Sequence, residues 1–172
     1  EFERIKRITT TSGMKLIVVH TKSPEETRAF GEAIGRRLDG GEVILLSGPL
    51  GAGKTTLVQG LARGLGISTP VQSPSFVLER LHQGRLLLRH LDFYRLGAAD
   101  VEESGFLDTA GEQDVTVVEW AERAGEVPGA TLRIEMKPDP VDPLRRGIAV
   151  EALTPLWGER IEDAQRQLSG TR

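Results

Sequence analysis

Eight consecutive residues decide the fold of this chain: Gly48-Pro49-Leu50-Gly51-Ala52-Gly53-Lys54-Thr55. They match the pattern G-x-x-x-x-G-K-S/T, and a short apolar segment, Val43 to Leu46, precedes them. A predicted helix begins at about Lys54 and runs to Leu65, where Gly66 stops it. A strand, a glycine-rich loop and a helix in this order are the context that a phosphate-binding P-loop requires. We therefore expect an α/β fold, a P-loop NTPase three-layer sandwich with a mixed, mainly parallel central sheet and added antiparallel strands.

The residue types in this loop suit a triphosphate. Glycines at positions 48, 51 and 53 let the backbone wrap closely and point successive N–H groups at phosphate oxygens. The helix that follows adds its N-terminal dipole and unpaired amides to the same anion site. Lys54 supplies a positive charge to the β- and γ-phosphates, and the Thr55 hydroxyl can ligate Mg²⁺. The sequence therefore predicts binding of a nucleoside triphosphate, with ATP as the expected one, together with Mg²⁺.

The composition narrows the class of protein. The 172 residues are 38% apolar and 27% charged, which fits one folded globular domain. A net charge of −3 argues against a body built mainly to coat nucleic acid. The chain has no cysteine, which excludes disulfides, Cys-based zinc sites and thiol catalysis. No apolar run approaches membrane-spanning length, and we expect a reducing, cytoplasmic setting.

The segment before Met14 differs from the rest. Residues 1–13 are mostly polar, and Met14 is followed by an apolar run, Leu16 to Val19. We expect residues 1–13 to be a cloning remnant or an upstream extension, disordered and outside the fold. Residues 14–172 are expected to form a single P-loop ATPase domain.

Other segments continue the α/β pattern. The Ser23-Pro24 pair predicts a capped helix that ends at Gly40-Gly41. A hairpin is predicted from Phe76 to Leu81 and Arg85 to Leu91, around His82-Gln83-Gly84. The remaining expected strands are Lys15 to His20, Val115 to Val118, Thr131 to Met136 and Gly147 to Leu153, and the remaining helices are Ala98 to about Leu107 and Trp157 to Leu168.

A P-loop site needs a further acid at the end of a nearby strand. Glu119 follows the strand Val115 to Val118, and Asp92 follows the second strand of the hairpin. We expect Glu119 to be the acid linked to the metal, and Asp92 to orient water or to act around the metal. The segment that begins at Asp108 resembles the D-x-x-G element of small GTPases, but no buried strand leads into it. The chain also has no asparagine, so the N-K-x-D element that reads guanine is absent.

Four segments together resemble one family. In order and rough spacing they follow the TsaE (YjeE) ATPases: Gly48 to Thr56, Ser73-Pro74-Ser75-Phe76, His90 to Leu96 (H-L-D-F-Y-R-L) and Glu119-Trp120-Ala121-Glu122. The resemblance covers about Lys15 to Leu153. The H-x-D-x-Y-R-L and E-W-x-E segments are much more specific to the family than the P-loop is.

The resemblance implies a function. Members of that family are bacterial ATPases needed to make threonylcarbamoyladenosine in tRNAs that read codons beginning with A. They work with the TsaD and TsaB subunits of the threonylcarbamoyl transferase, and their weak hydrolysis is stimulated in the complex. ATP turnover would then reset or license that complex, with tRNA contacted indirectly.

The resemblance also assigns roles by position. Residues 48–56 would hold the nucleotide, with Lys54 on the phosphates and Thr55 with Glu119 on Mg²⁺. Asp92 would be the essential acid of its segment. Ser75, where the family usually has Thr, would lie in a mobile loop near the γ-phosphate. A basic residue after the last strands also approaches the nucleotide in the family, and Arg145 is the expected counterpart.

Plainer interpretations stay open at this point. Tyr94 and Arg95 could be a strand-end aromatic and a surface arginine, and Trp120 either core or an anchor facing a partner. His90 is interpreted as a structural histidine. A small-molecule P-loop kinase is an alternative function, although no arginine-rich lid follows the P-loop helix. A nucleotide-gated interaction module that functions without turnover is the other alternative.

Overall fold

The computed structural model describes residues 8–9, 14–74, 78–105, 108 and 111–170. The strands are β1 (Ile8–Thr9), β2 (Lys15–Thr21), β3 (Val43–Ser47), β4 (Glu79–Gln83), β5 (Leu87–Asp92), β6 (Asp114–Glu119), β7 (Leu132–Pro138) and β8 (Arg146–Ala152). The helices are α1 (Pro24–Gly35), α2 (Lys54–Gly64), α3 (Ala98–Ser104), the short 3-10 helix η1 (Ala121–Arg123) and α4 (Pro155–Gly170). None of the helices in these ranges has the length and apolar character needed to cross a membrane.

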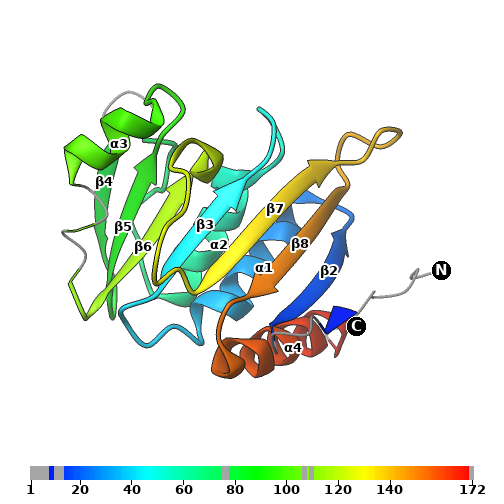
Figure 1. Ribbon diagram of the computed structural model, residues 1–172. Helices are drawn as coiled ribbons and strands as arrows, with labels where there is room; N and C mark the ends of the chain where they lie inside the picture. The colour runs from blue at the N-terminus through cyan, green and yellow to red at the C-terminus, as the bar shows by residue number, and fades with distance from the viewer. Residues whose placement is uncertain (1–7, 10–13, 75–77, 106–107, 109–110, 171–172) are drawn as a thin grey trace.

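All strands join one eight-stranded sheet in the order β1-β2-β8-β7-β3-β6-β5-β4 (Figure 1). At its centre β3 lies between β6 and β7 and runs parallel to both, and β5 runs parallel to β6. The outer pairs, β1–β2, β2–β8, β7–β8 and β4–β5, are antiparallel. The expected mixed sheet with a parallel centre and added antiparallel strands is confirmed.

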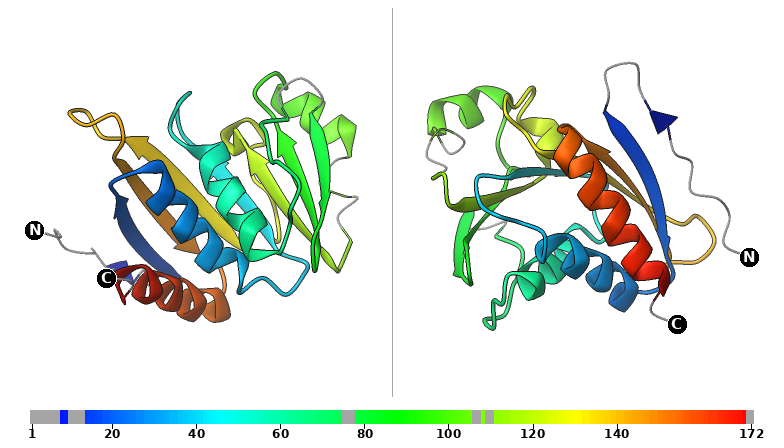
Figure 2. Two further views of the ribbon diagram at one scale, coloured as in Figure 1. Left: turned by 180° about the vertical axis from the view of Figure 1, so that it is seen from behind. Right: turned by 90° about the horizontal axis from the view of Figure 1, so that it is seen from below.

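Helices cover both faces of the sheet. Helices α1 and α2 lie behind it in Figure 1, and α3 and η1 lie on the opposite side, as the view from below in Figure 2 shows. Helix α4 packs against α1 and against β2 and β8. The α1–α2 layer, the sheet and the α3–η1 layer are the three layers of the predicted sandwich. The α3–η1 layer contains the shorter helices.

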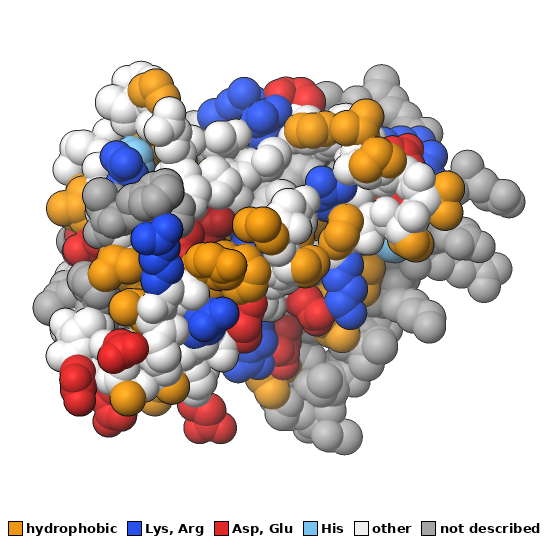
Figure 3. All heavy atoms as spheres, turned by 90° about the horizontal axis from the view of Figure 1, so that it is seen from above, with side chains coloured by type: hydrophobic (Ala, Val, Ile, Leu, Met, Phe, Trp, Pro, Cys, Tyr) orange, Lys and Arg blue, Asp and Glu red, His pale blue; other side chains and the backbone are white. Residues whose placement is uncertain are grey.

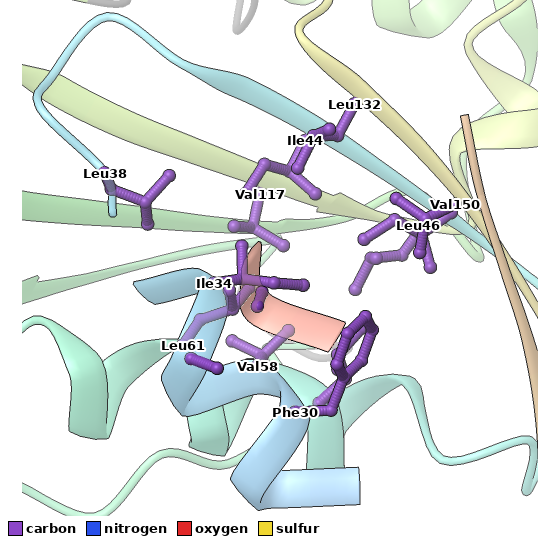
Figure 4. Close-up of a cluster of buried hydrophobic side chains, with 14 of the residues drawn as sticks. Phe30, Ile34, Leu38, Ile44, Leu46, Val58, Leu61, Val117, Leu132 and Val150 are labelled. Atoms are coloured by element: carbon purple, nitrogen blue, oxygen red, sulfur yellow. The ribbon is translucent and has the colours of Figure 1, made fainter. Parts of the chain in front are cut away.

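Strand β3 sends alternate side chains into two separate apolar clusters. Ile44 and Leu46 are fully buried in the cluster under α1 and α2, and Leu45 is buried in the one under α3 and η1. Successive side chains of a strand point to opposite faces of the sheet, and both faces are buried at β3. Every position in the middle of the strand is therefore apolar. Figure 4 shows the larger cluster, to which both helices and strands contribute: Phe30, Ile34, Val58, Leu61, Val117 and Val150. Full burial of one such side chain stabilises the fold by about 1.5–3 kcal/mol.

Glycines let α1 and α2 pack backbone against backbone. A Cβ at Gly31 would lie 2.4 Å from the carbonyl oxygen of Leu57, and one at Gly60 would lie 2.2 Å from that of Arg28. Gly35 and Gly64 repeat the arrangement one turn further along, with 2.4 and 2.5 Å to carbonyl oxygens of the facing helix. This close crossing fixes α2, and with it the loop at the start of α2, against the rest of the fold.

Several element bounds differ from the expectations. Helix α1 begins as predicted, with Ser23 accepting from the backbone N–H of Glu26 at 3.1 Å, but it ends at Gly35 rather than at Gly40-Gly41. Ile8 and Thr9, expected to lie outside the fold, pair antiparallel with β2. The hairpin of β4 and β5 is confirmed over its described part, and its predicted start, Phe76 and Val77, lies outside the described residues.

Candidate active site

The P-loop connects the end of β3 to the start of α2, at the edge where the parallel strands end. Gly48 has a φ of 140°, and a Cβ there would lie 2.3 Å from the carbonyl oxygen of Met136 in β7. Gly53 has a φ of 96° and immediately precedes α2. Both positions therefore demand glycine, one for close approach to β7 and the other for the left-handed turn into the helix. The predicted strand, loop and helix are confirmed, and unpaired amides at the start of a helix such as α2 are groups that can bind an anion.

Lys54, the first residue of α2, is buried beneath its own loop. Its Nζ donates to the carbonyl oxygens of Gly48 at 2.5 Å and Pro49 at 3.0 Å, and lies 4.0 Å from the centre of the Trp120 ring. Burial lowers the pKa of Lys54, while the nearby carboxylates of Glu119, Glu122 and Asp92 act in the opposite direction. The charge is thus held in position, and phosphate oxygens are stronger acceptors for it than neutral carbonyls.

Glu119 meets Thr55 across the mouth of the loop. The Thr55 hydroxyl lies 2.9 Å from Oε1 and 3.2 Å from Oε2 of Glu119, which ends β6 and is only 3% exposed. The register of β3 and β6 pairs Leu46 with Glu119, so the acid stands beside the strand that delivers the P-loop. A hydroxyl and a carboxylate are the hard oxygen ligands that Mg²⁺ takes. The residues present therefore fit the predicted metal.

Asp92 and His90 reach the same place from the neighbouring strand. The Asp92 carboxylate accepts from the Tyr94 backbone N–H at 2.8 Å and from the Ser73 hydroxyl at 3.1 Å. The His90 Nε2 atom lies 2.5 Å from Glu119 Oε2, and neither side chain is open to solvent. The two predicted acids are therefore brought together at the ends of adjacent strands, each with partners of its own.

Lys54, Thr55, Asp92 and Glu119 line one cleft of about 490 Å³. Figure 3 looks onto this end of the molecule, where charged side chains of both signs lie among apolar ones. Most of the predicted nucleotide residues lie on the cleft wall, with further residues from the segment before β4, from the ends of β5 and β6 and just beyond them, and from the start of β8. The lining residues are Leu50, Gly51, Ala52, Gly53, Lys54, Thr55, Thr56, Ser73, Asp92, Tyr94, Arg95, Glu119, Trp120 and Arg146. Gly48 and Pro49 contribute instead through the carbonyls that hold Lys54.

Arg146, the neighbour of the predicted Arg145, lies at the cleft. Arg146 begins β8, lines the cleft and donates through Nη2 to the carbonyl oxygen of Gly51 at 3.0 Å. Arg145 forms an ion pair with Asp142 in the β7–β8 turn, at 3.4 Å, and does not line the cleft. Of the two adjacent arginines, Arg146 is therefore the one that lines the cleft. The sequence pattern alone does not show which of the two does so. Ser75 lies outside the described residues.

Four further cleft residues were not predicted as site residues: Ser73, Tyr94, Arg95 and Trp120. Trp120 has a φ of 57°, unusual for a residue with a side chain, and its ring covers Lys54 and contacts Tyr94 with 4.8 Å between ring centres. Tyr94 is also within reach of Arg123, whose guanidinium lies 5.4 Å from the ring centre. Trp120 directly follows the strand-end acid Glu119, and Tyr94 lies two residues beyond the strand-end acid Asp92. This spacing is the feature of the sequence that could have identified both aromatic residues as part of the site.

Comparison with known proteins decides the family. The model of the family "Threonylcarbamoyl adenosine biosynthesis protein TsaE" matches residues 21–147, most of the chain. The chain belongs to the TsaE family. The role of the TsaE family lies in tRNA threonylcarbamoyladenosine biosynthesis, as its description states.

Individual TsaE relatives agree with this assignment. The TsaE protein of Treponema pallidum is 41% identical over 119 residues, a match that covers 68% of this chain and 88% of the relative. The TsaE protein of Bacillus subtilis is 39% identical over 126 residues, with 72% and 79% covered. The crystal structure of Bacillus subtilis YdiB superposes with a TM-score of 0.73 at 32% identity, over 90% of this chain and 97% of that one.

Proposed function

We propose that this chain binds ATP with Mg²⁺ and hydrolyses it as an accessory protein of the threonylcarbamoyl transferase that modifies tRNA. The observation that carries the proposal is the meeting of Lys54, Thr55 and Glu119 at the mouth of the P-loop. A positive charge, a hydroxyl and a buried carboxylate at the end of a parallel sheet are the components that P-loop hydrolysis requires. Family membership supports the setting in tRNA modification.

In this proposal the reaction is in-line attack by water on the γ-phosphorus. A bond forms from the water oxygen, the bond to the β–γ bridging oxygen breaks, and ADP, inorganic phosphate and a proton are released. Lys54 and the loop amides stabilise the charge that builds up on the transferred group. Asp92, held by Ser73 and Tyr94 beside the cleft, orients the water. Thr55 and Glu119 would hold Mg²⁺, which would supply further charge neutralisation on the phosphates.

The proposed partners are TsaD-like and TsaB-like subunits, with tRNA contacted indirectly. Hydrolysis by the chain alone is expected to be weak, because nothing in the described residues closes the cleft against water. Several apolar side chains stand exposed at this end of the molecule, Leu50 at 82% and Tyr94 at 43% among them. Partner contact over the cleft would cover such side chains and exclude water.

The experiment is a measurement of ATP turnover by the chain alone, with the TsaD and TsaB proteins of the same organism, and with each singly. We expect turnover to rise when both partners are present, and Lys54→Ala to abolish it in every mixture. Partners that show the same turnover with and without the chain would contradict the proposed accessory role. Phosphate transfer to a metabolite in place of water would favour the kinase alternative.

A further inference from the structure

His90 stands where the fold itself favours an apolar residue. It lies in β5 between β4 and β6, on the same face as Leu88, and its side chain is fully buried. A buried polar group must find a hydrogen-bond partner, or its burial destabilises the fold. For His90 the partner is not part of the core but the Glu119 carboxylate, at 2.5 Å from Nε2.

The surroundings of His90 select one tautomer. Within the described residues the Nδ1 atom is buried and has no hydrogen-bond partner. A proton on Nδ1 would be a buried hydrogen-bond donor without an acceptor, which destabilises the fold. An unprotonated Nδ1 leaves only a lone pair without a donor, and this costs less free energy. The geometry therefore favours the tautomer with its proton on Nε2, which donates in a hydrogen bond to Glu119.

Two donors fix the Glu119 carboxylate from different elements. His90 holds Oε2 from the interior of the sheet, and the Thr55 hydroxyl holds Oε1 at 2.9 Å from the start of α2. The register of β5 and β6 pairs His90 with Val117, so the imidazole reaches diagonally along the sheet to the residue that ends β6. Among the described residues, removal of this contact would leave the carboxylate with the Thr55 hydroxyl, which must also serve the metal in the proposed function.

We propose that His90 is a positioning residue, which orients the Glu119 carboxylate so that its other oxygen faces Thr55 and the cleft. The inference rests on the proposed function and adds to it a fixed ligand geometry for Mg²⁺. Partners that orient a ligating carboxylate typically change metal affinity or activity by about 10- to 100-fold when they are removed. His90 need not touch the nucleotide to have this effect.

The test compares two replacements of His90. In His90→Gln the side-chain amide can reach the position of Nε2 and donate to Glu119, whereas in His90→Asn the shorter side chain places its amide near the position of Nδ1. We expect His90→Asn to lower kcat and to raise the Mg²⁺ concentration needed for half-maximal nucleotide binding, each by about tenfold or more. The KM for ATP should change far less, because Lys54 and the loop still hold the phosphates. His90→Gln should recover most of both losses.

A matched control is His82→Asn. His82 is also largely buried, on the same face of the sheet as His90, and it does not contact Glu119. We expect that variant to keep the wild-type Mg²⁺ dependence. Nucleotide binding, followed by the fluorescence of a labelled ATP analogue, reports on the metal independently of turnover.

The outcomes separate this inference from the proposed function. Wild-type protein without ATP turnover, alone or with partners, contradicts the proposed function. Wild-type turnover combined with unchanged Mg²⁺ dependence in His90→Asn overturns the positioning role alone. Equal loss in His90→Gln and His90→Asn, with equal loss of thermal stability, assigns His90 to the fold and also overturns it.

Discussion

Asp92 and Glu119 are direct partners in the register of β5 and β6, so two buried carboxylates stand side by side at the end of the parallel sheet. Each is 3% exposed, and each has its own hydrogen-bond donors. Those of Asp92 come from Ser73 and from the backbone of Tyr94, and those of Glu119 from Thr55 and His90. The two acids are therefore held separately, which suits one for the metal and the other for water. The positive charge of Lys54 interacts with both carboxylates and opposes their repulsion.

Glu119→Ala should lose hydrolysis more than binding. The substitution removes the carboxylate beside Thr55 but leaves Lys54 and the loop amides in place. We expect kcat to fall by about a hundredfold or more, with a change of only a few-fold in the Kd for ATP. Steady-state turnover and equilibrium binding on the same preparation check this. Unchanged hydrolysis would refute the assignment of Glu119.

Arg146→Ala and Arg145→Ala form a matched pair. Arg146 donates to the carbonyl oxygen of Gly51 in the P-loop, whereas Arg145 pairs with Asp142 outside the cleft. We expect Arg146→Ala to weaken ATP binding by about tenfold, the scale of one hydrogen bond to a charged group. Arg145→Ala should bind as the wild type does. A larger effect at Arg145 would restore the expectation drawn from the sequence and exclude Arg146.

The nucleotide affinity should fall at alkaline pH. Burial lowers the pKa of Lys54, and only its charged form attracts phosphate. Binding is thus complete below the lowered pKa and is lost as the pH rises through it, sooner than for an ordinary lysine. Titration with an ATP analogue from neutral pH upward would show the decline. Lys54→Arg, whose guanidinium stays charged, should bind more weakly but with little pH dependence; an equal slope in both proteins would assign the decline to another group.

Gly60→Ala should destabilise the whole domain. The added methyl would lie 2.2 Å from the carbonyl oxygen of Arg28, and backbone on both sides prevents an easy adjustment. Overpacking of this kind lowers the free energy of unfolding by about 1–3 kcal/mol. Urea denaturation measures it, with Gly170→Ala as the control, because nothing lies within 4 Å of a Cβ at Gly170. Equal stability of the two variants would mean that α1 and α2 do not cross as closely as described.

The P-loop and the strand-end acids could be predicted from the sequence because each is recognised from the segments directly next to it in the chain. Gly48 to Thr55 falls between an apolar strand and a helix, and Glu119 ends a buried strand that is rich in valine. The carboxyl ends of parallel strands meet at one edge of a sheet, so the two features had to come close together.

The parts that could not be predicted depend on register. Arg146 reaches the cleft because strand alternation places it on the same face as Ile148 and Val150, and a shift of one residue would have placed Arg145 there. The contact of His90 with Glu119 likewise requires the alignment of β5 on β6. The Gly-x-x-x-Gly spacing of Gly60 and Gly64 can be read from the sequence. The sequence does not show, however, that these glycines pack against α1.

The central claim is that the P-loop, Lys54, Thr55 and Glu119 form one site for ATP and Mg²⁺. Calorimetric titration of ATP into the wild-type chain and into Lys54→Ala, each with and without Mg²⁺, tests it most directly. We predict saturable one-to-one binding by the wild type that Mg²⁺ strengthens, and no binding by Lys54→Ala. An absence of heat in the wild type, or the same affinity in Lys54→Ala, would contradict it.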